Sequence, residues 1–504
     1  MILFISYIYK AIVLFEYFNT LIRISAKMRN SIASIVYKTK DRKKYLGGSM
    51  EREKFKSRLG FILLSAGCAI GIGNVWRFPY VVGNSGGGAF VLFYLFFLII
   101  LGLPIMTMEF AVGRASRKSA VRAFEALEKK GQKWHFHGYA AMLGNYLLMM
   151  FYTTVAGWML NYFVGMATGK FSGVDATGIQ TEFSNMLGNP KILTFWMVVV
   201  VLIGFGVCSL GLQKGVEKIT KVMMLVLLAI MVILAIVSVT MEGGKEGLEF
   251  YLVPNFTKMQ EIGISKVVVS SMNQAFFTLS LGIGSMTIFG SYLGKERSLL
   301  GESINIAFLD TFVAIVAGLI IFPACFAFGV NPDSGPSLIF ITLPNIFNTM
   351  PGGRIWGSCF FLFMAFASLS TVIAVFENII SSCMDLWGWS RKKAAGLNII
   401  IMIIASMPCV LGFNVLAGFE PLGAGTTILD LEDFIVSNLM LPIGSLIFTL
   451  FCVSRYGWGF DNYLNEVNDG KGVKMPLFIR GYCRFVLPVI VVIIIVNGLY
   501  SFFR

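Results

Sequence analysis

Two short stretches of the sequence combine closely spaced glycines with small polar residues. Residues 67–74 read GCAIGIGN and residues 279–285 read LSLGIGS, each with Gly-Ile-Gly near its centre. A glycine inside a helix costs about 1 kcal/mol relative to alanine, so two close together favour unwinding. An unwound helix offers N–H groups that suit a carboxylate and carbonyl oxygens that suit a hard cation. These stretches therefore predict a site for a zwitterion and an alkali cation.

Neutral oxygen-bearing side chains accompany the two stretches. Asn74, Thr278 and Ser280 lie in or beside them, and Ser370 and Thr371 follow farther along the chain. Hard cations prefer oxygen ligands, whereas no cluster of His or Cys suggests a transition metal. The alternative is that the glycines only let helices pack closely, as small residues do in membranes. A nucleotide site is not expected, because no third glycine, preceding strand or P-loop lysine accompanies the glycines.

The surrounding sequence has the composition of a membrane protein. The chain has 504 residues, of which 56% are apolar and 13% are charged, and its mean hydropathy is +0.77. A helix crosses the hydrocarbon with about 20 mostly apolar residues. Eleven stretches meet this test: 59–83, 88–113, 138–166, 191–210, 216–240, 266–293, 303–330, 353–386, 395–414, 426–453 and 480–502. We therefore expect one all-α bundle, with no second soluble domain.

The two glycine stretches fall in the first and sixth of these spans. Lipid cannot satisfy the backbone groups that unwinding frees, so each break must line a cavity inside the protein. An offset of five helices makes the second copy inverted in the membrane. Interrupted helices at matching places in two halves indicate the central binding site of a transporter.

The formal charge of +14 raises the alternative of nucleic-acid binding. However, the Lys and Arg residues cluster in every second loop, at 52–58, 114–133, 214–221, 295–297 and 391–393. This alternation follows the positive-inside rule and predicts a cytoplasmic amino end. We expect no nucleic-acid partner, and contact with membrane lipid instead.

Three features of the sequence are expected to lie outside the binding chemistry. Residues 1–49 are interpreted as a non-native or disordered extension, with Met50 as the true start and 50–504 as the transporter domain. The eight cysteines suit apolar packing. His135 and His137 fall in a basic loop and are expected at the surface. No nucleophile–base pair suggests an enzyme.

Several motifs resemble those of the neurotransmitter:sodium symporter family. They are residues 71–80 (GIGNVWRFPY), 86–90 (GGGAF), 104–114 (from Pro104 through Glu109 to Gly113-Arg114), 274–280 (QAFFTLS), 335–337 (GPS) and 430–434 (DLEDF). They occur in family order between about residues 51 and 502. The resemblance implies the LeuT-type fold of five plus five inverted helices, with an eleventh and no twelfth. The lack of a twelfth helix resembles a bacterial subgroup and implies a bacterial plasma membrane.

The resemblance also implies binding residues for two sodium ions and one amino acid. The first sodium ion would be held with the substrate carboxylate by Ala69, Asn74, Thr278 and Asp310. The second would be held by Gly67, Ile70, Ala367, Ser370 and Thr371. The substrate would be held by Ala69, Gly71, Ile72, Gly73, Leu148, Tyr152, Phe277, Thr278, Ser280, Ile283, Thr371 and Val375. Glu109 is expected to hydrogen-bond the unwound backbone of the sixth span.

Two departures from animal relatives refine the expected function. Asp310 stands where chloride-dependent relatives usually have Asn, so its carboxylate could supply the charge that they take from chloride; the alternative is a protonated or ion-paired structural Asp. Gly71 stands where monoamine carriers hold Asp, so the ligand must bring its own carboxylate. The apolar pocket residues favour a neutral amino acid with an apolar or aromatic side chain, because a buried charge there would lack a partner.

Two Arg–Asp pairs resemble gates. Arg77 would pair with Asp433 on the outer side, and Arg52 with Asp385 on the inner side, braced by Tyr292. Alternatively, Arg77 is an interfacial cation and Arg52 an ordinary positive-inside residue. The expected function is sodium-coupled import of a neutral amino acid by alternating access. The alternative is a non-transporting amino-acid sensor on the same scaffold.

Overall fold

The computed structural model describes residues 53–329 and 337–503. The proposed extension 1–49, the gate residue Arg52 and most of the 335–337 motif lie outside the described residues. Within the described ranges the chain is helical, with one isolated β-bridge between Arg297 and Lys471. The predicted all-α fold is confirmed.

Nine helices in the described residues are long and apolar enough to cross a membrane. They are α5–η2–α6 (Gly88–Ser116), α8 (His135–Thr168), α10 (Pro190–Ser209), η3–α11 (Leu212–Val239), α16 (Leu299–Ala327), α18 (Gly353–Trp387), α19 (Arg391–Leu411), α20–η5–α21 (Ile428–Val453) and α23–η6–α24 (Ile479–Leu499 of a run that ends at Phe503). The π-helical parts among these are η2 (Leu98–Gly102), η3 (Leu212–Glu217), η5 (Ile435–Met440) and η6 (Tyr482–Val486).

The two remaining predicted spans are each broken. The first consists of α3 (Arg58–Ala69) and, after a bend of 56°, the segment Gly73–Asn84, which comprises η1 (Gly73–Arg77) and α4 (Phe78–Asn84). The second consists of α14 (Ile264–Thr278) and α15 (Ser285–Tyr292), which six residues connect. Both predicted interruptions are therefore present at the predicted glycines.

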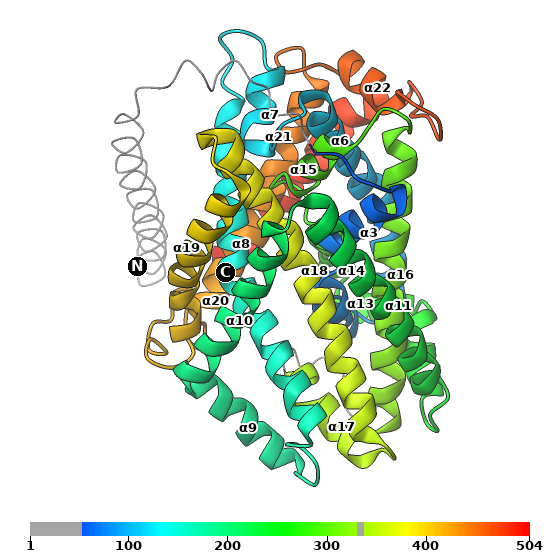
Figure 1. Cartoon of the computed structure of the whole chain (residues 1–504). Helices are drawn as coiled ribbons and strands as arrows, with labels where there is room; N and C mark the ends of the chain where they lie inside the picture. Colours follow the sequence, from blue (N-terminus) through cyan, green and yellow to red (C-terminus); the bar gives the residue numbers. More distant parts are fainter. Residues whose placement is uncertain (1–52, 330–336, 504) are drawn as a thin grey trace, which may run out of the picture.

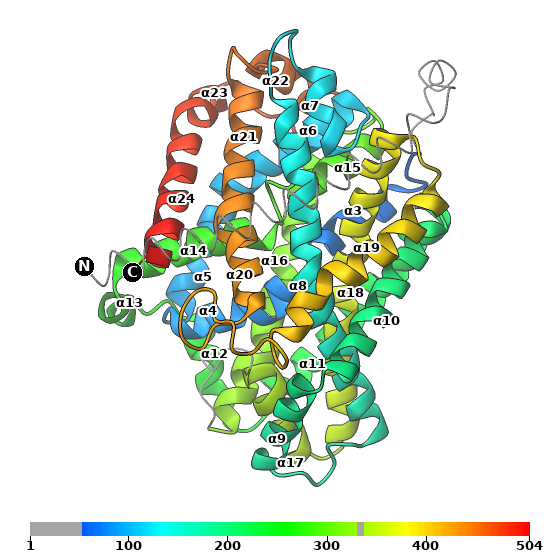
Figure 2. The ribbon, with the colours of Figure 1, turned by 90° about the vertical axis from the view of Figure 1, so that its left-hand side faces the viewer.

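Shorter helices close the two ends of the bundle (Figures 1 and 2). One end carries α7 (Ala120–Leu127), α15 and α22 (Phe460–Asn468), and we call it the α7 end. The opposite end carries α9 (Ala176–Gly188) and α17 (Leu343–Thr349), and we call it the α9 end. Two further short helices, α12 (Lys245–Leu252) and α13 (Phe256–Ile262), precede α14.

Backbone conformation explains where the second break falls. Gly282 and Gly284 adopt φ of 102° and 71°, in the left-handed region that favours glycine. Ser280 adopts φ of 50°, which is uncommon for a residue with a side chain. A β-carbon on Gly282 would also lie 2.0 Å from the Leu441 carbonyl oxygen. The glycine therefore lets the connection lie directly against α21 (Leu441–Val453).

The long helices α8 and α18 lie side by side in the middle of the bundle and support both breaks (Figure 1). The half-helix α3 packs against α11 (Lys218–Val239), α16 and α18, while α15 packs against α6 (Leu103–Ser116). The fold thus brings both interrupted helices against the same central scaffold.

Candidate functional site

The first break presents its free backbone groups to polar side chains. Ile70 ends α3 in an extended conformation (φ −70°, ψ 99°). The Gly71 amide donates to Asn74 Oδ1 (3.2 Å), and the Ile72 amide donates to the Tyr152 hydroxyl (3.0 Å). Tyr152, on α8, is therefore fixed at the unwound residues.

The second break is held by three buried side chains. Glu109 accepts hydrogen bonds from the amides of Gly282 (2.5 Å) and Met286 (3.2 Å), which confirms the predicted contact of Glu109 with the unwound backbone. Asn145 Nδ2 donates to the Ile283 carbonyl (2.9 Å), and Asn378 Nδ2 donates to Asn145 Oδ1 (3.1 Å). The two asparagines were missed, because nothing in the sequence links them to residue 283.

A buried oxygen cluster joins the two breaks to α16. Asn74 Nδ2 donates to Asp310 Oδ1 (2.8 Å) and to Thr278 Oγ1 (3.1 Å), and Thr278 Oγ1 donates to Asp310 Oδ2 (3.0 Å). All three side chains are at most 1% exposed. Three of the four residues expected at the first sodium ion thus meet in hydrogen-bond contact, and Ala69 lies at the end of α3 beside them.

A second cluster of oxygens lies between α3 and α18. Ser370 Oγ contacts the carbonyl oxygens of Ala367 (2.8 Å) and Ile70 (3.4 Å). Thr371 Oγ1 contacts those of Gly67 (3.2 Å) and Ile70 (3.3 Å). All five residues expected at the second sodium ion therefore converge. Their donor set is made of neutral oxygens, which fits a hard monovalent cation.

A small enclosed cavity lies between the two breaks. Its volume is about 20 Å³, somewhat more than the 10–15 Å³ that one water molecule needs. It is lined by Cys68, Ala69, Gly71, Gly73, Leu148, Tyr152, Phe277, Ser280, Thr371 and Leu441. No residue of this lining carries a formal charge. The ring of Phe277 limits the space, since a β-carbon on Gly73 would lie 2.9 Å from it.

Eight of the twelve predicted substrate residues line this cavity. Ile72 and Thr278 directly adjoin lining residues in the chain, and Val375 is fully buried in α18 but is not part of the lining. Ile283 lines a different cavity, because the left-handed turn at Gly282 directs the chain toward α21. Cys68 lies inside the predicted break and could have been found there, whereas no sequence signal marks Leu441.

At the α9 side of this cavity, Arg77 lies over Phe277. The guanidinium carbon is 4.0 Å from the centre of the ring. Asp433, its predicted partner, accepts a hydrogen bond from Ser437 Oγ (2.7 Å), and the structure has no ion pair within 4.0 Å between Arg77 and Asp433. In this conformation the arginine therefore contacts the cavity wall rather than the opposite helix.

At the α7 end, the predicted gate residues take part in contacts that were not foreseen. Asp385 accepts hydrogen bonds from the Ser119 amide (2.7 Å) and hydroxyl (2.6 Å). The Tyr292 hydroxyl donates to Glu377 Oε1 (2.6 Å). Phe55 packs edge-on against the Tyr292 ring at 5.8 Å between centroids. Phe55, in the stretch that precedes α3, thus packs on the end of α15.

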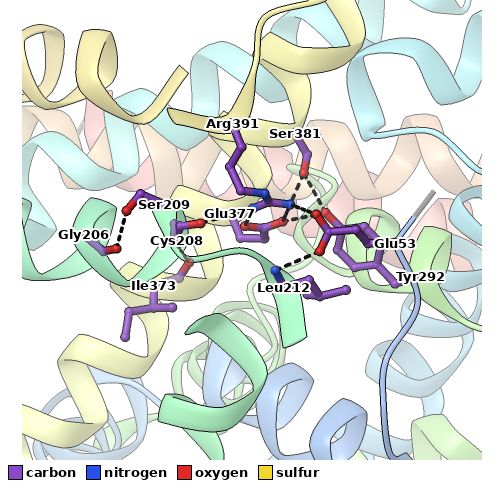
Figure 3. A network of polar contacts seen from close by, with 10 residues as sticks. All are labelled: Glu53, Gly206, Cys208, Ser209, Leu212, Tyr292, Ile373, Glu377, Ser381 and Arg391. Atoms are coloured by element: carbon purple, nitrogen blue, oxygen red, sulfur yellow. Dashed lines mark hydrogen bonds and ion pairs between the residues drawn. The ribbon is translucent and has the colours of Figure 1, made fainter. Parts of the chain in front are cut away.

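An ion-pair network closes the same region (Figure 3). Arg391 binds Glu377 at 2.6 Å and Glu53 at 3.1 Å, and Glu53 accepts a hydrogen bond from the Leu212 amide (2.8 Å). Glu377 is fully buried. The network links Glu53, which precedes α3, to α18 and α19, and none of its three charged residues was predicted to belong to the gate.

The expectation of two surface histidines was wrong for one of them. His137 is 8% exposed, because it packs between Phe124 of α7 and Phe448 of α21, whose ring centres lie 5.1 and 5.3 Å from it. His135 is half-buried and binds Glu128 (2.6 Å). The first turn of α8 therefore carries a buried histidine because α7 and α21 pack against it.

Comparison with known proteins extends these observations. A profile described as the Sodium:neurotransmitter symporter family matches residues 52–177 and 177–503. An uncharacterized sodium-dependent transporter of Bacillus subtilis, YhdH, is 32% identical over 453 residues, covering 89% of this chain and 98% of that protein. An uncharacterized sodium-dependent transporter of Haemophilus influenzae is 31% identical over 463 residues, covering 89% and 99%.

A solved structure shares the fold. The crystal structure of MhsT in complex with L-phenylalanine superimposes with a TM-score of 0.80 and 36% sequence identity, covering 89% of this chain and 100% of that chain.

Proposed function

This chain belongs to the sodium:neurotransmitter symporter family and is a sodium-dependent symporter, and we propose that its substrate is a neutral amino acid with an apolar or aromatic side chain. One observation carries the proposal: the cavity between the two breaks adjoins unwound backbone yet has no charged lining residue. A zwitterion can satisfy its charges on backbone groups and ions there, whereas a charged side chain would be buried without a partner. The phenylalanine bound to MhsT supports this class of substrate.

The proposed substrate pose follows from the ends of the half-helices. The amino end at Gly73 carries partial positive charge and would attract the carboxylate, together with the Tyr152 hydroxyl. The carbonyl ends of α3 and α14 would accept hydrogen bonds from the amine. The cavity is smaller than any amino acid, so we expect Phe277 to move away from Gly73 when the substrate enters.

Two sodium ions are proposed to accompany the substrate. Asn74, Thr278 and Asp310 would hold the first, next to the substrate carboxylate, and the oxygens around Ser370 and Thr371 would hold the second. The first ion would hold the two breaks together beside the substrate carboxylate, and the second would favour contact between α3 and α18, which couples ion binding to that of the substrate. The sodium ions supply positive charge, and the protein orients the oxygens that surround them.

Chloride is proposed not to be required. Asp310 already places a carboxyl group at the first cluster, where Asn74 and Thr278 both contact it. A fixed negative charge there compensates the sodium ion without a second anion.

We propose that transport proceeds by alternating access across a bacterial plasma membrane, with the amino end in the cytoplasm. A tenfold sodium gradient contributes about 1.4 kcal/mol and 100 mV about 2.3 kcal/mol per charge. Two ions thus supply roughly 7 kcal/mol, the equivalent of about 10⁵-fold accumulation. One ion would support only a few hundredfold, so the limiting ratio distinguishes the two stoichiometries.

The test is uptake into proteoliposomes under an inward sodium gradient, with each amino acid offered as a competitor. We expect accumulation that sodium drives and that apolar or aromatic amino acids inhibit best. Competition by charged amino acids alone would contradict the substrate class. Saturable binding without accumulation would instead favour the sensor.

A further inference from the structure

A second cavity adjoins the same connection between α14 and α15. Its volume is about 250 Å³. It is lined by His137, Ala140, Ala141, Gly282, Ile283, Ile435, Leu439, Met440, Ile443, Gly444 and Ile447. Ser280 and Leu441 line the small cavity, whereas Gly282 and Met440 line this one. We call it the α8–α21 crevice, after the helices that form its walls.

The crevice opens toward the surface that lipid surrounds. Ile443 is 41% exposed and Ala140 is also exposed, and both lie in membrane-spanning helices. All lining residues except His137 are apolar. Its volume approaches the lower end of small-molecule sites, about 300 Å³. An apolar molecule from the bilayer is therefore the class of ligand that can reach and fill it.

One polar group faces this apolar space. The imidazole of His137 is buried in the wall beside the Gly282 backbone, and within the described part of the chain its Nε2 makes no hydrogen bond of good geometry. Phe124 and Phe448 pack edge-on against the ring and fix its plane. An orphaned buried donor or acceptor of this kind favours a ligand that carries one polar group.

Both helices of the crevice end among basic residues at the α7 end. Lys129, Lys130 and Lys133 precede α8, and Arg455 follows α21; all four are exposed. The two chain segments touch, since Lys129 Nζ donates to the Arg455 carbonyl (3.0 Å).

The acidic residues of the same loop do not cancel this charge. Glu125 pairs with Arg122, and Glu128 pairs with His135. The rim therefore keeps a net positive charge, which attracts anionic headgroups at the cytoplasmic leaflet.

We propose that the α8–α21 crevice binds one anionic phospholipid of the cytoplasmic leaflet. Its phosphate would meet the basic rim, an ester carbonyl would meet His137, and one acyl chain would occupy the apolar walls. Lys133 lies in the loop two residues before α8 begins, and His137 lies in the first turn of that helix. The protein thus presents cationic, polar and apolar groups in the order in which a phospholipid carries phosphate, ester and chain.

Such a lipid would act on the substrate cavity through a shared segment. Gly282 lies against α21 so closely that a β-carbon on Gly444 would be 2.0 Å from the Gly282 carbonyl oxygen. A chain seated against Ile283 and Met440 would hold this contact and with it the second break. Lipid and substrate would then influence each other's affinity by the same factor.

The test measures retained lipid, so it does not depend on transport. The protein is reconstituted in vesicles of equal phosphatidylglycerol and phosphatidylcholine, extracted again in detergent, and analysed for bound lipid by mass spectrometry. We expect about one retained phosphatidylglycerol per chain. The retained phosphatidylglycerol should exceed the retained phosphatidylcholine at least threefold. Ala140→Phe, which fills the crevice, should lower the retained phosphatidylglycerol at least threefold. Val232→Phe, on the exposed face of α11, is the matched control and should not.

A second variant tests the rim without touching the crevice. Lys130→Gln/Lys133→Gln should remove the preference for phosphatidylglycerol over phosphatidylcholine, even if Ala140→Phe fails to fold. Equal retention of both lipids by the wild-type protein would overturn the proposal. Unchanged retention of phosphatidylglycerol by Ala140→Phe would also overturn it, if that variant elutes and unfolds like the wild-type protein.

Discussion

The guanidinium carbon of Arg77 lies 4.0 Å from the centre of the Phe277 ring, and the same ring packs against Gly73. One side chain therefore separates the outer arginine from the unwound backbone of the first break. A substrate that displaces Phe277 must also displace Arg77, which would free the guanidinium for Asp433. This contact would link the proposed outer gate to the proposed substrate cavity.

Arg77→Lys should lower transport while leaving the fold intact. Lysine has no planar group that could stack on Phe277 or bind a carboxylate at two points. Its ammonium would retain only part of a cation–π contact that contributes about 0.5–2 kcal/mol. We expect maximal uptake to fall several-fold in proteoliposomes, with Arg354→Lys, which also lies toward the α9 end, close to wild type. Equal loss in both variants would contradict a specific role for Arg77.

Gly71→Ala should abolish substrate binding. Its β-carbon would lie 2.2 Å from the Tyr152 hydroxyl and 2.6 Å from Thr371 Oγ1, so both side chains would have to move. We expect affinity to fall at least tenfold in equilibrium binding. Gly206→Ala, in α10 with nothing within 4 Å of the new β-carbon, should bind normally. Normal binding by both variants would show that the substrate does not use this part of the break.

Thr371→Val should weaken sodium binding at the second cluster. The substitution keeps the side-chain shape and removes the hydroxyl that contacts the Gly67 and Ile70 carbonyls. We expect the sodium concentration for half-maximal uptake to rise at least tenfold. Thr449→Val is the control, because Thr449 is also buried and donates to the carbonyl four residues earlier. A similar shift in both variants would argue for a general loss of stability.

Asp310→Asn should either make uptake depend on chloride or abolish uptake. The asparagine side chain lacks the negative charge that would compensate sodium. Its amino group would also face the hydrogen-bond donors of Asn74 and Thr278, and a donor left unpaired in this way costs about 1–3 kcal/mol. Wild-type uptake should be unchanged when gluconate replaces chloride, while the residual uptake of the variant should fall. Wild-type uptake that collapses in gluconate would contradict the proposed role of Asp310.

The Arg391–Glu377 pair should contribute more to stability than an exposed pair. Removing one partner of a buried pair costs about 3–5 kcal/mol, because the other charge is left unpaired. A double-mutant cycle of Glu377→Gln and Arg391→Gln, followed by thermal unfolding, should give a coupling energy of at least about 1 kcal/mol. The exposed Arg480–Asp461 pair, at 2.9 Å, is the control and should give a value near zero. Equal coupling in the two cycles would contradict a stabilising role for the Arg391–Glu377 pair.

Much of the site could be predicted because its chemistry is local in sequence. The glycines of both breaks and the neighbouring Asn74 and Thr278 mark unwinding and oxygen ligands within a few residues. Glu109, 173 residues from Gly282, could be assigned to the second break only through the family resemblance.

The remainder depends on tertiary packing that a pattern does not contain. The Glu53–Arg391–Glu377 network joins residues up to 338 positions apart, and each looks like an ordinary loop or helix-end charge. His137 is buried by α7 and α21, whose packing against the start of α8 no periodicity reveals. Ile283 lines the α8–α21 crevice because Gly282, just before it, adopts a left-handed conformation. Helical spacing therefore could not predict which of the two cavities Ile283 lines.

The most direct measurement of the central claim is equilibrium binding of the best-competing amino acid to purified protein, with sodium titrated against choline. If the two breaks hold ion and zwitterion together, amino-acid affinity should rise at least tenfold from sodium-free to saturating conditions, and Thr371→Val should shift the sodium midpoint. An affinity that is the same in choline and in sodium would contradict the account.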